Sequence, residues 1–312
     1  MKKKISIVVP CYNEEETIPL FHSALTKAID EREEQFEVLF VNDGSVDKTQ
    51  EILEGLAGND NRIKVISFSR NFGQQAALFC GLEHSTGDCA ICMDVDLQDP
   101  IDVAMQMIER WNEGCEIVHG RRTKRKGENF VKKASSNLYL SFLRRISGLD
   151  IPKNVGEFKL LDRRVIDVVV QMPELKRYMR GLTSWVGFRH DYVDFERPRR
   201  VAGRTRWSLG SLLKLAGAGI ISFSTWPLTL AIKFGLWFGF LSVVALITFG
   251  ILAIVGTTMP VWAWLVPSIT LLFAITWFLM GLSNIYLRRV YEECLNRPRY
   301  IVAKTINTGR EN

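Results

Sequence analysis

The stretch GDCAICMDVDLQDP, residues 87–100, sets a run of small apolar residues directly before three carboxylates. The apolar part predicts a buried strand, and Asp94, Asp96 and Asp99 follow it. Two residues apart on a strand, Asp94 and Asp96 are expected to point to one face, which suits two oxygen ligands of one hard divalent cation. An alternative stays open, because Asp is common where strands become loops and Pro100 can begin a helix.

The first 120 residues alternate between short β-branched runs and segments of helix length. In two of those segments, residues 15–29 and 73–85, apolar residues recur at spacings of three and four. Such alternation predicts an α/β fold, with a mostly parallel, Rossmann-like sheet and helices on both faces. The predicted strands are residues 5–10, 36–41, 63–68, 89–94 and 116–120.

A polar motif follows each predicted strand. In chain order the motifs are PCYNEEE, NDGSVDKT, SRNFGQ, DVDLQDP and GRRTKRK. Because ligands of open α/β sheets bind beyond the carboxyl ends of the strands, these motifs predict one binding rim for a nucleotide diphosphate. The chain contains no G-x-x-x-x-G-K-[ST] loop, which excludes a P-loop ATPase, and no G-x-G-x-x-G after the first strand, which counts against a dinucleotide dehydrogenase.

Charge is distributed unevenly along the 312 residues, whose formal net charge is +6. Between Leu215 and Leu287 the only charged residue is Lys233. This pattern favours a polar domain joined to a membrane part, with no nucleic acid as a partner.

Two apolar stretches, residues 232–255 and 261–287, are each long enough to span a bilayer, at roughly 35 Å or more. They predict a two-helix transmembrane hairpin within residues 229–289, and the basic residues that flank it place both ends in the cytoplasm. Residues 207–228 are predicted to lie as an amphipathic segment in the membrane interface. A cytoplasmic catalytic domain over residues 1–206 and a tail over residues 290–312 complete the predicted organisation.

Cysteine and histidine give little support for a metal site. Cys89-x-x-Cys92 has half of a zinc spacing, but no second pair completes it, so buried thiols in a reducing cytoplasm are expected. The four histidines are scattered, and none is assigned a catalytic role.

The ordered motifs VVPCYNEE, VNDGS, RNFGQ and MDVDLQDP resemble family 2 glycosyltransferases of the GT-A fold. More narrowly, the chain is similar to the polyprenyl-phosphate branch, which includes dolichol-phosphate mannose synthases and bacterial bactoprenol (undecaprenyl-phosphate) glucosyltransferases. NVGEFKLLDRRV at residues 154–165, the stretch at residues 200–228 and RPRYIV at residues 297–302 extend the resemblance over essentially the whole chain.

The resemblance implies a set of site residues. The donor nucleotide is assigned Pro10, Tyr12, Asn13, Glu14, Asp43, Asp94 and Gln98; the metal, Mg²⁺ or Mn²⁺, is assigned Asp94 and Asp96; and the phosphates of donor or acceptor are assigned Arg121, Lys132, Lys133 and Arg200. Asp94, Asp96 and Glu157 are the catalytic candidates. Glu157 stands where relatives usually carry Asp, and it is interpreted as an orienter or a weak base.

The basic run from Arg121 to Lys133 has two interpretations that stay open together. It supplies a field that brings an anionic acceptor to an anionic donor, or it is a solvated face that binds anionic lipid headgroups.

The resemblance implies transfer of a hexose from a nucleotide sugar to undecaprenyl phosphate at the inner membrane of a bacterium, for an O-antigen or another envelope glycan. Glucose from UDP-glucose is the first expectation, and a homo-oligomer, with a tetramer as one form, is expected. Two alternatives stay open: a transferase that uses another nucleotide sugar or a non-phosphate lipid acceptor, and a non-catalytic membrane scaffold.

Overall fold

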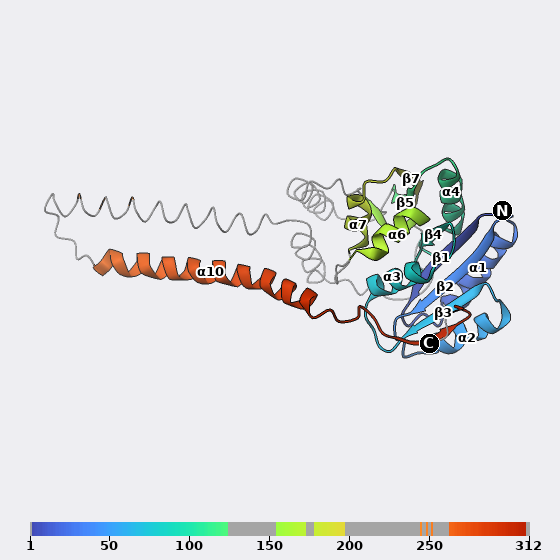
Figure 1. The fold of residues 1–312 in the computed structure, drawn as a ribbon, viewed down its shortest axis with the longest axis horizontal. Helices are drawn as coiled ribbons and strands as arrows, with labels where there is room; N and C mark the ends of the chain where they lie inside the picture. Colours follow the sequence, from blue (N-terminus) through green and yellow to red (C-terminus); the bar gives the residue numbers. More distant parts are fainter. Residues whose placement is uncertain are drawn as a thin grey trace. The chain divides into compact units, whose positions relative to one another are not determined.

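The computed structural model describes residues 2–123, 154–172, 178–196 and 262–309, together with residues 244, 248 and 251. Its strands are β1 (Lys4–Cys11), β2 (Gln35–Asn42), β3 (Ile63–Phe68), β4 (Cys89–Cys92), β5 (Ile117–Arg122), β6 (Val155–Asp162), β7 (His190–Phe195) and β8 (Val302–Ile306). Its helices are α1 (Ile18–Asp30), α2 (Thr49–Asn59), α3 (Gln74–His84), α4 (Ile101–Asn112), α6 (Arg163–Gln171), α7 (Met179–Trp185) and α10 (Trp262–Cys294) (Figure 1).

In the described part of the chain, eight strands form one sheet in the order β7-β5-β6-β4-β1-β2-β3-β8. β1 pairs in parallel with β2 and β4, β2 with β3, and β5 with β7. β6 runs antiparallel to both β4 and β5. The predicted mostly parallel α/β sheet is therefore confirmed. Because β6 is reversed, it begins at the rim where β4 and β5 end.

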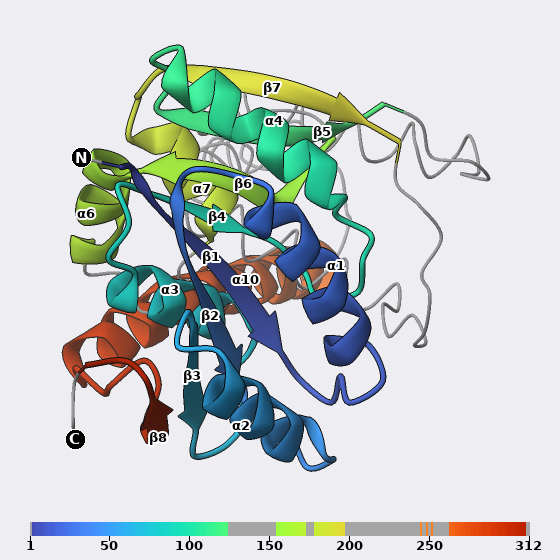
Figure 2. The ribbon, with the colours of Figure 1, turned by 90° about the vertical axis from the view of Figure 1, so that its right-hand side faces the viewer.

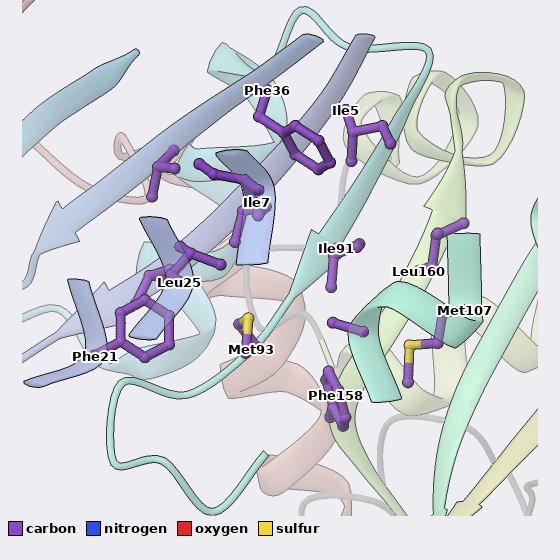
Figure 3. Packing of buried hydrophobic residues seen from close by; sticks show 14 of the residues in the cluster. Ile5, Ile7, Phe21, Leu25, Phe36, Ile91, Met93, Met107, Phe158 and Leu160 are labelled. Carbon is purple, nitrogen blue, oxygen red and sulfur yellow. The ribbon is translucent and has the colours of Figure 1, made fainter. Parts of the chain in front are cut away.

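Helices cover both faces of this sheet, as predicted (Figure 2). On one face, Phe21 and Leu25 of α1 and Met107 of α4 pack on a cluster that includes Ile7 and Ile91 of the sheet (Figure 3). On the other face α3 packs on a smaller cluster formed by Val41, Ile66, Phe68, Ala77 and Cys80. These strands carry apolar residues toward both layers, which explains their nearly continuous apolar sequences.

The chain divides into two compact units, one of residues 1–208 with 298–312 and the other of residues 209–297. The first unit holds the sheet, and the second holds α10. Within the predicted tail, β8 pairs antiparallel with β3, and Tyr300 stacks on Phe68 with ring centroids 4.9 Å apart. The end of the chain is thus part of the first unit.

No helix among the described residues meets the length and apolarity of a membrane span. The juxtamembrane segment at residues 207–228 lies outside the described residues, as does the first predicted span apart from residues 244, 248 and 251. The hairpin stays a prediction from the sequence.

Candidate active site

The loop after β1 is fastened to the loop after β2. Asn13 has a positive φ of 54°, its backbone N donates to Ser45 Oγ at 2.9 Å, and its Oδ1 accepts from Val46 N at 2.9 Å. Glu14 N donates to Thr49 Oγ1 at 2.9 Å. Asn13 and Glu14, both predicted to bind the donor nucleotide, therefore fix the loop after β1 against the segment that follows β2.

Two other donor candidates flank this contact. Pro10 is buried within β1, whereas Tyr12, one residue past the strand, is exposed. Of the two, Tyr12 is the one whose side chain is accessible from outside the sheet.

Asp43 is buried directly behind β2 and faces the loop after β3. Its Oδ1 accepts from Phe72 N at 2.6 Å and its Oδ2 accepts from Gly73 N at 2.9 Å. Burial raises the pKa of Asp43, although the two amides and the charge of Arg70 oppose that shift. Asp43 therefore fixes the start of α3 relative to β2.

Gly44 makes the close approach of these loops possible. It has a φ of +68°, and a Cβ at this position would lie 2.4 Å from the carbonyl carbon of Arg70. A residue with a side chain would clash with that backbone, which accounts for the glycine of the NDGS motif.

Asp94 and Asp96 lie past the end of β4, so the prediction that they share a strand face is wrong. The strand stops at Cys92, two residues earlier than predicted, because the chain turns at residues 95–96. In this turn Gln98 N donates to Asp96 Oδ1 at 3.1 Å, and Leu97 has a φ of 58°. A bulky residue at positive φ is strained, and such strain is typical of functional loops.

The carboxylate of Asp94 is held from outside this turn. Gln74 Nε2, at the first position of α3, donates to Asp94 Oδ1 at 2.7 Å. Asp94 N donates to Asp99 Oδ2 at 3.1 Å, which closes the turn on itself. Asp96 and Gln98 are both buried.

Glu157 lies on β6, beside the end of β4. The ladder pairs Cys92, the last residue of β4, with Lys159, so Glu157 lies two residues before that pair on β6, at the rim end of the sheet. Glu157 Oε1 accepts from Arg180 Nε at 3.1 Å, and its Oε2 lies 3.5 Å from Lys159 Nζ. Burial acts to raise the pKa of Glu157, but Lys159, Arg180 and a hydrogen bond from Gln75 outweigh it, so the pKa lies below its ordinary value.

The two arginines at the end of β5 differ in their surroundings. Arg121, a predicted phosphate ligand, forms a two-point ion pair with Asp194 of β7 through distances of 2.5 and 2.8 Å. Arg122 is more buried, and its Nη2 lies 3.9 Å from Asp99 Oδ1. A Cβ on Gly156 would lie 2.9 Å from this Nη2, so the glycine leaves space for the Arg122 guanidinium beside the Asp94–Asp99 turn.

The structure thus brings Asp43, Asp94, Asp96, Gln98 and Glu157 to the rim formed by the carboxyl ends of β2 and β4 and the start of β6. Lys132, Lys133 and Arg200 lie outside the described residues.

Sequence reasoning assigned no role to Gln74, Gln75 or Arg180, although the RNFGQ motif contains the first of them. Gln74 could have been selected as a site residue because it begins a predicted helix directly after a loop of the rim.

The residues present fit a divalent cation shared with a substrate. No group of three or more His, Cys, Asp or Glu residues that could hold a metal occurs among the described residues. Mg²⁺ is usually held by one or two carboxylates together with substrate phosphates, and Asp94 and Asp96 are the carboxylates of this turn that would serve as its protein ligands. Cys89 and Cys92 are buried in β4 as free thiols.

The fold matches glucosyl-3-phosphoglycerate synthase from Mycobacterium tuberculosis, solved with Mn²⁺, uridine diphosphate and glucosyl-3-phosphoglycerate. The TM-score is 0.50 at 17% sequence identity, covering 71% of this chain and 80% of that chain. The fold is thus that of the GT-A glycosyltransferases. The sequence pattern described as glycosyl transferase family 2 matches residues 6–170, and the chain belongs to that family.

Two relatives match nearly the whole chain. The uncharacterised glycosyltransferase YkcC of Bacillus subtilis is 40% identical over 310 residues, which cover 98% of this chain and 95% of the relative. The bactoprenol glucosyl transferase of Shigella phage SfII is 38% identical over 307 residues, which cover 97% of this chain and 98% of the relative. The protein is therefore a glycosyltransferase related over its length to bactoprenol glucosyl transferases.

Proposed function

We propose that this glycosyltransferase moves a hexose, with glucose from UDP-glucose as the first candidate, onto undecaprenyl phosphate. The observation that carries the proposal is the 38% identity to the bactoprenol glucosyl transferase of phage SfII over 97% of this chain. The match extends beyond the family 2 region at residues 6–170 into the apolar C-terminal part. A shared acceptor, and not only a shared donor fold, is the simplest reason for a full-length match.

The rim supports this reaction chemically. Asp94 and Asp96 would hold Mg²⁺ or Mn²⁺, and such an ion when bound would offset the negative charge that develops on the departing diphosphate. Asp43, Tyr12, Asn13 and Glu14 lie on the loops of β1 and β2, where the nucleoside is proposed to bind, with Pro10 beneath them and Gln98 beside the donor phosphates.

In the proposed step, an oxygen of the lipid phosphate attacks the anomeric carbon of the sugar. The bond from that carbon to the diphosphate breaks, and its electron pair leaves with the nucleoside diphosphate, so one displacement inverts the configuration. A phosphate monoester has a second pKa of about 6, so it is mostly a dianion at pH 7 and needs little help from a base.

Glu157 is accordingly proposed as an orienting residue. Its carboxylate is ionised between Lys159 and Arg180, and a group with a lowered pKa is a weak proton acceptor. Arg122, Arg121, Lys132, Lys133 and Arg200 are proposed to supply positive charge that brings the anionic acceptor toward the anionic donor.

The proposed setting is the bacterial inner membrane, with the first unit in the cytoplasm. The apolar stretches at residues 232–255 and 261–287 support a hairpin that anchors the chain in the membrane that contains the lipid acceptor. Small residues in these stretches, such as Gly235 and Gly239, support close helix packing in a homo-oligomer, for which a tetramer is one possible form.

Membranes containing the full-length protein should be incubated with undecaprenyl phosphate, Mg²⁺ or Mn²⁺ and a panel of radiolabelled nucleotide sugars. Label that enters the organic phase from one donor, and that a chelator blocks, supports the reaction and names the sugar. Transfer to diacylglycerol but not to undecaprenyl phosphate would favour the alternative acceptor. A folded protein that transfers no sugar from any donor would favour the scaffold.

A further inference from the structure

Four consecutive residues around the start of α3 contact Asp43 and Asp94 at the rim and the first residue of α7. This FGQQ segment, Phe72 to Gln75, belongs to the one rim motif to which the reaction above gives no task. Phe72 N and Gly73 N donate to Asp43, on the proposed nucleoside side. The two glutamines that follow contact different carboxylates.

Gln74 contacts the side of the rim that is proposed to bind the nucleotide sugar. Its Nε2 donates to Asp94 Oδ1 at 2.7 Å, from a position fixed one residue after the Gly73–Asp43 bond. A neutral amide that donates to one oxygen of a carboxylate restrains its rotation and leaves its charge in place. Such restraint of a ligand is how neighbours of metal-binding carboxylates act.

Gln75 contacts the other side of the rim, where α7 and Glu157 lie. Its Oε1 accepts from Met179 N, the first residue of α7, at 3.2 Å. Its side chain also lies close enough to Glu157 to help lower the pKa of that carboxylate, and Glu157 accepts from Arg180, which follows Met179 on α7. Gln75 therefore joins α3 to both β6 and α7.

Resting on the proposed function, we propose that Gln74 and Gln75 are positioning residues that set the donor carboxylate Asp94 and the Glu157–Arg180 pair relative to each other from one helix turn. Adjacent residues on a helix point about 100° apart, so one rigid turn aims two amides at two neighbouring strands. The same segment is also bound to Asp43. The relative positions of the nucleoside, diphosphate and acceptor sides of the site therefore all depend on residues 72–75.

The test uses full-length protein in detergent with Gln74→Met and Gln75→Met, which keep side-chain length and remove the amide. Gln106→Ala, on the exposed face of α4, is the matched control. Calorimetry measures Mn²⁺ binding in the presence of UDP, and initial rates give KM for UDP-glucose, KM for undecaprenyl phosphate and kcat. Thermal unfolding checks that each variant is folded.

We expect Gln74→Met to raise the Kd for Mn²⁺ about 10- to 100-fold and to leave the acceptor KM within about twofold. We expect Gln75→Met to lower kcat about tenfold or more and to leave the Kd for Mn²⁺ within about twofold. A purely structural role would change both quantities together. Gln75→Glu, which keeps the acceptor for Met179 N but puts a second carboxylate near Glu157, should lower kcat at least as far as Gln75→Met.

Parallel losses in both variants, or no loss in either, would overturn the inference. If the wild-type protein transfers no hexose, the proposed function fails, and the Mn²⁺ titration still decides the part that concerns Gln74. If the wild-type protein transfers hexose and the two variants behave like Gln106→Ala, the proposed function stands and the positioning role is refuted.

Discussion

Arg180 and Glu157 form an ion pair in which Arg180 Nε lies 3.1 Å from Glu157 Oε1, and this pair joins α7 to the rim end of β6. The other oxygen of Glu157 faces Lys159, whose side chain is fully buried. One carboxylate between two cations is suited to holding charges in place. It is poorly suited to accepting a proton.

The pH dependence of transfer tests this interpretation. The pKa of Glu157 lies below its ordinary value of 4.5. The carboxylate is therefore mostly ionised throughout an assay carried out above pH 4.5. We expect Glu157→Gln to lower kcat by about tenfold or more and to leave unchanged any acid limb near pH 6, which belongs to the acceptor phosphate. Initial rates between pH 5 and 9 measure this, and loss of that limb in the variant would identify Glu157 as the base.

Removing Glu157 should also destabilise the first unit through Lys159. Breaking a buried ion pair on one side costs about 3–5 kcal/mol, because the remaining charge is left without compensation. We expect Glu157→Gln to lose about this much stability, and the double variant Glu157→Gln with Lys159→Met to recover most of it. Urea unfolding followed by circular dichroism compares the two, and a double variant no more stable than the single one would contradict the pairing.

Asp96→Asn tests the proposed metal site. If Asp96 is a ligand, its loss removes Lewis-acid stabilisation worth several kcal/mol, so we expect transfer to fall by about 100-fold or more. The thermal unfolding temperature should change little. Asp167→Asn, on the exposed side of α6, is the matched control and should retain activity. Full activity in Asp96→Asn would refute the assignment.

Glu37 should make the stability of the fold depend on acid pH. Its buried carboxylate lies 2.6 Å from Lys64 Nζ and accepts from Ser6 Oγ at 2.6 Å. Burial opposes ionisation, but these contacts outweigh it and lower the pKa from 4.5 to about 2. Ionised Glu37 therefore stabilises the folded state above pH 4.5, and this contribution is lost as the pH falls toward 2.

The size of this effect is on the order of 3 kcal/mol. We expect Glu37→Gln to lose about that much stability at pH 7 and to show a smaller pH dependence than the wild type between pH 4.5 and 2. Urea unfolding at several pH values measures it, with Glu51→Gln on the exposed face of α2 as the control. Equal slopes for wild type and Glu37→Gln would show that this carboxylate is not responsible.

The first half of the fold was predictable because each strand there is an apolar run followed by a polar loop. β1, β2 and β3 lie within one residue of their predicted bounds. β6, β7 and β8 were not predicted as strands. VGEFKLLD and HDYVDF mix charged with apolar residues and lack the long apolar runs of β1, β2 and β3, so their strand character depends on neighbours that are distant in sequence.

The sequence predicted which carboxylates lie at the site, but not the hydrogen bonds and ion pairs that hold them. Asp43, Asp94 and Glu157 were selected from motifs, whereas the amides that hold Asp43 and Asp94 come from residues 72–74 and one of the two cations beside Glu157 comes from α7. Local spacing carries no information about such long-range contacts. The error at Asp94 and Asp96 has a similar cause, because the turn at residues 95–96 depends on hydrogen bonds that no strand pattern reveals.

The pairing of β8 with β3 has a consequence for biosynthesis. β8 follows α10 in the sequence, so the ribosome releases the edge partner of β3 only after the whole apolar stretch has been made. Until then β3 presents an unpaired edge, which is a site for wrong pairing with other chains. The nascent first unit is therefore complete only once the second unit has been synthesised.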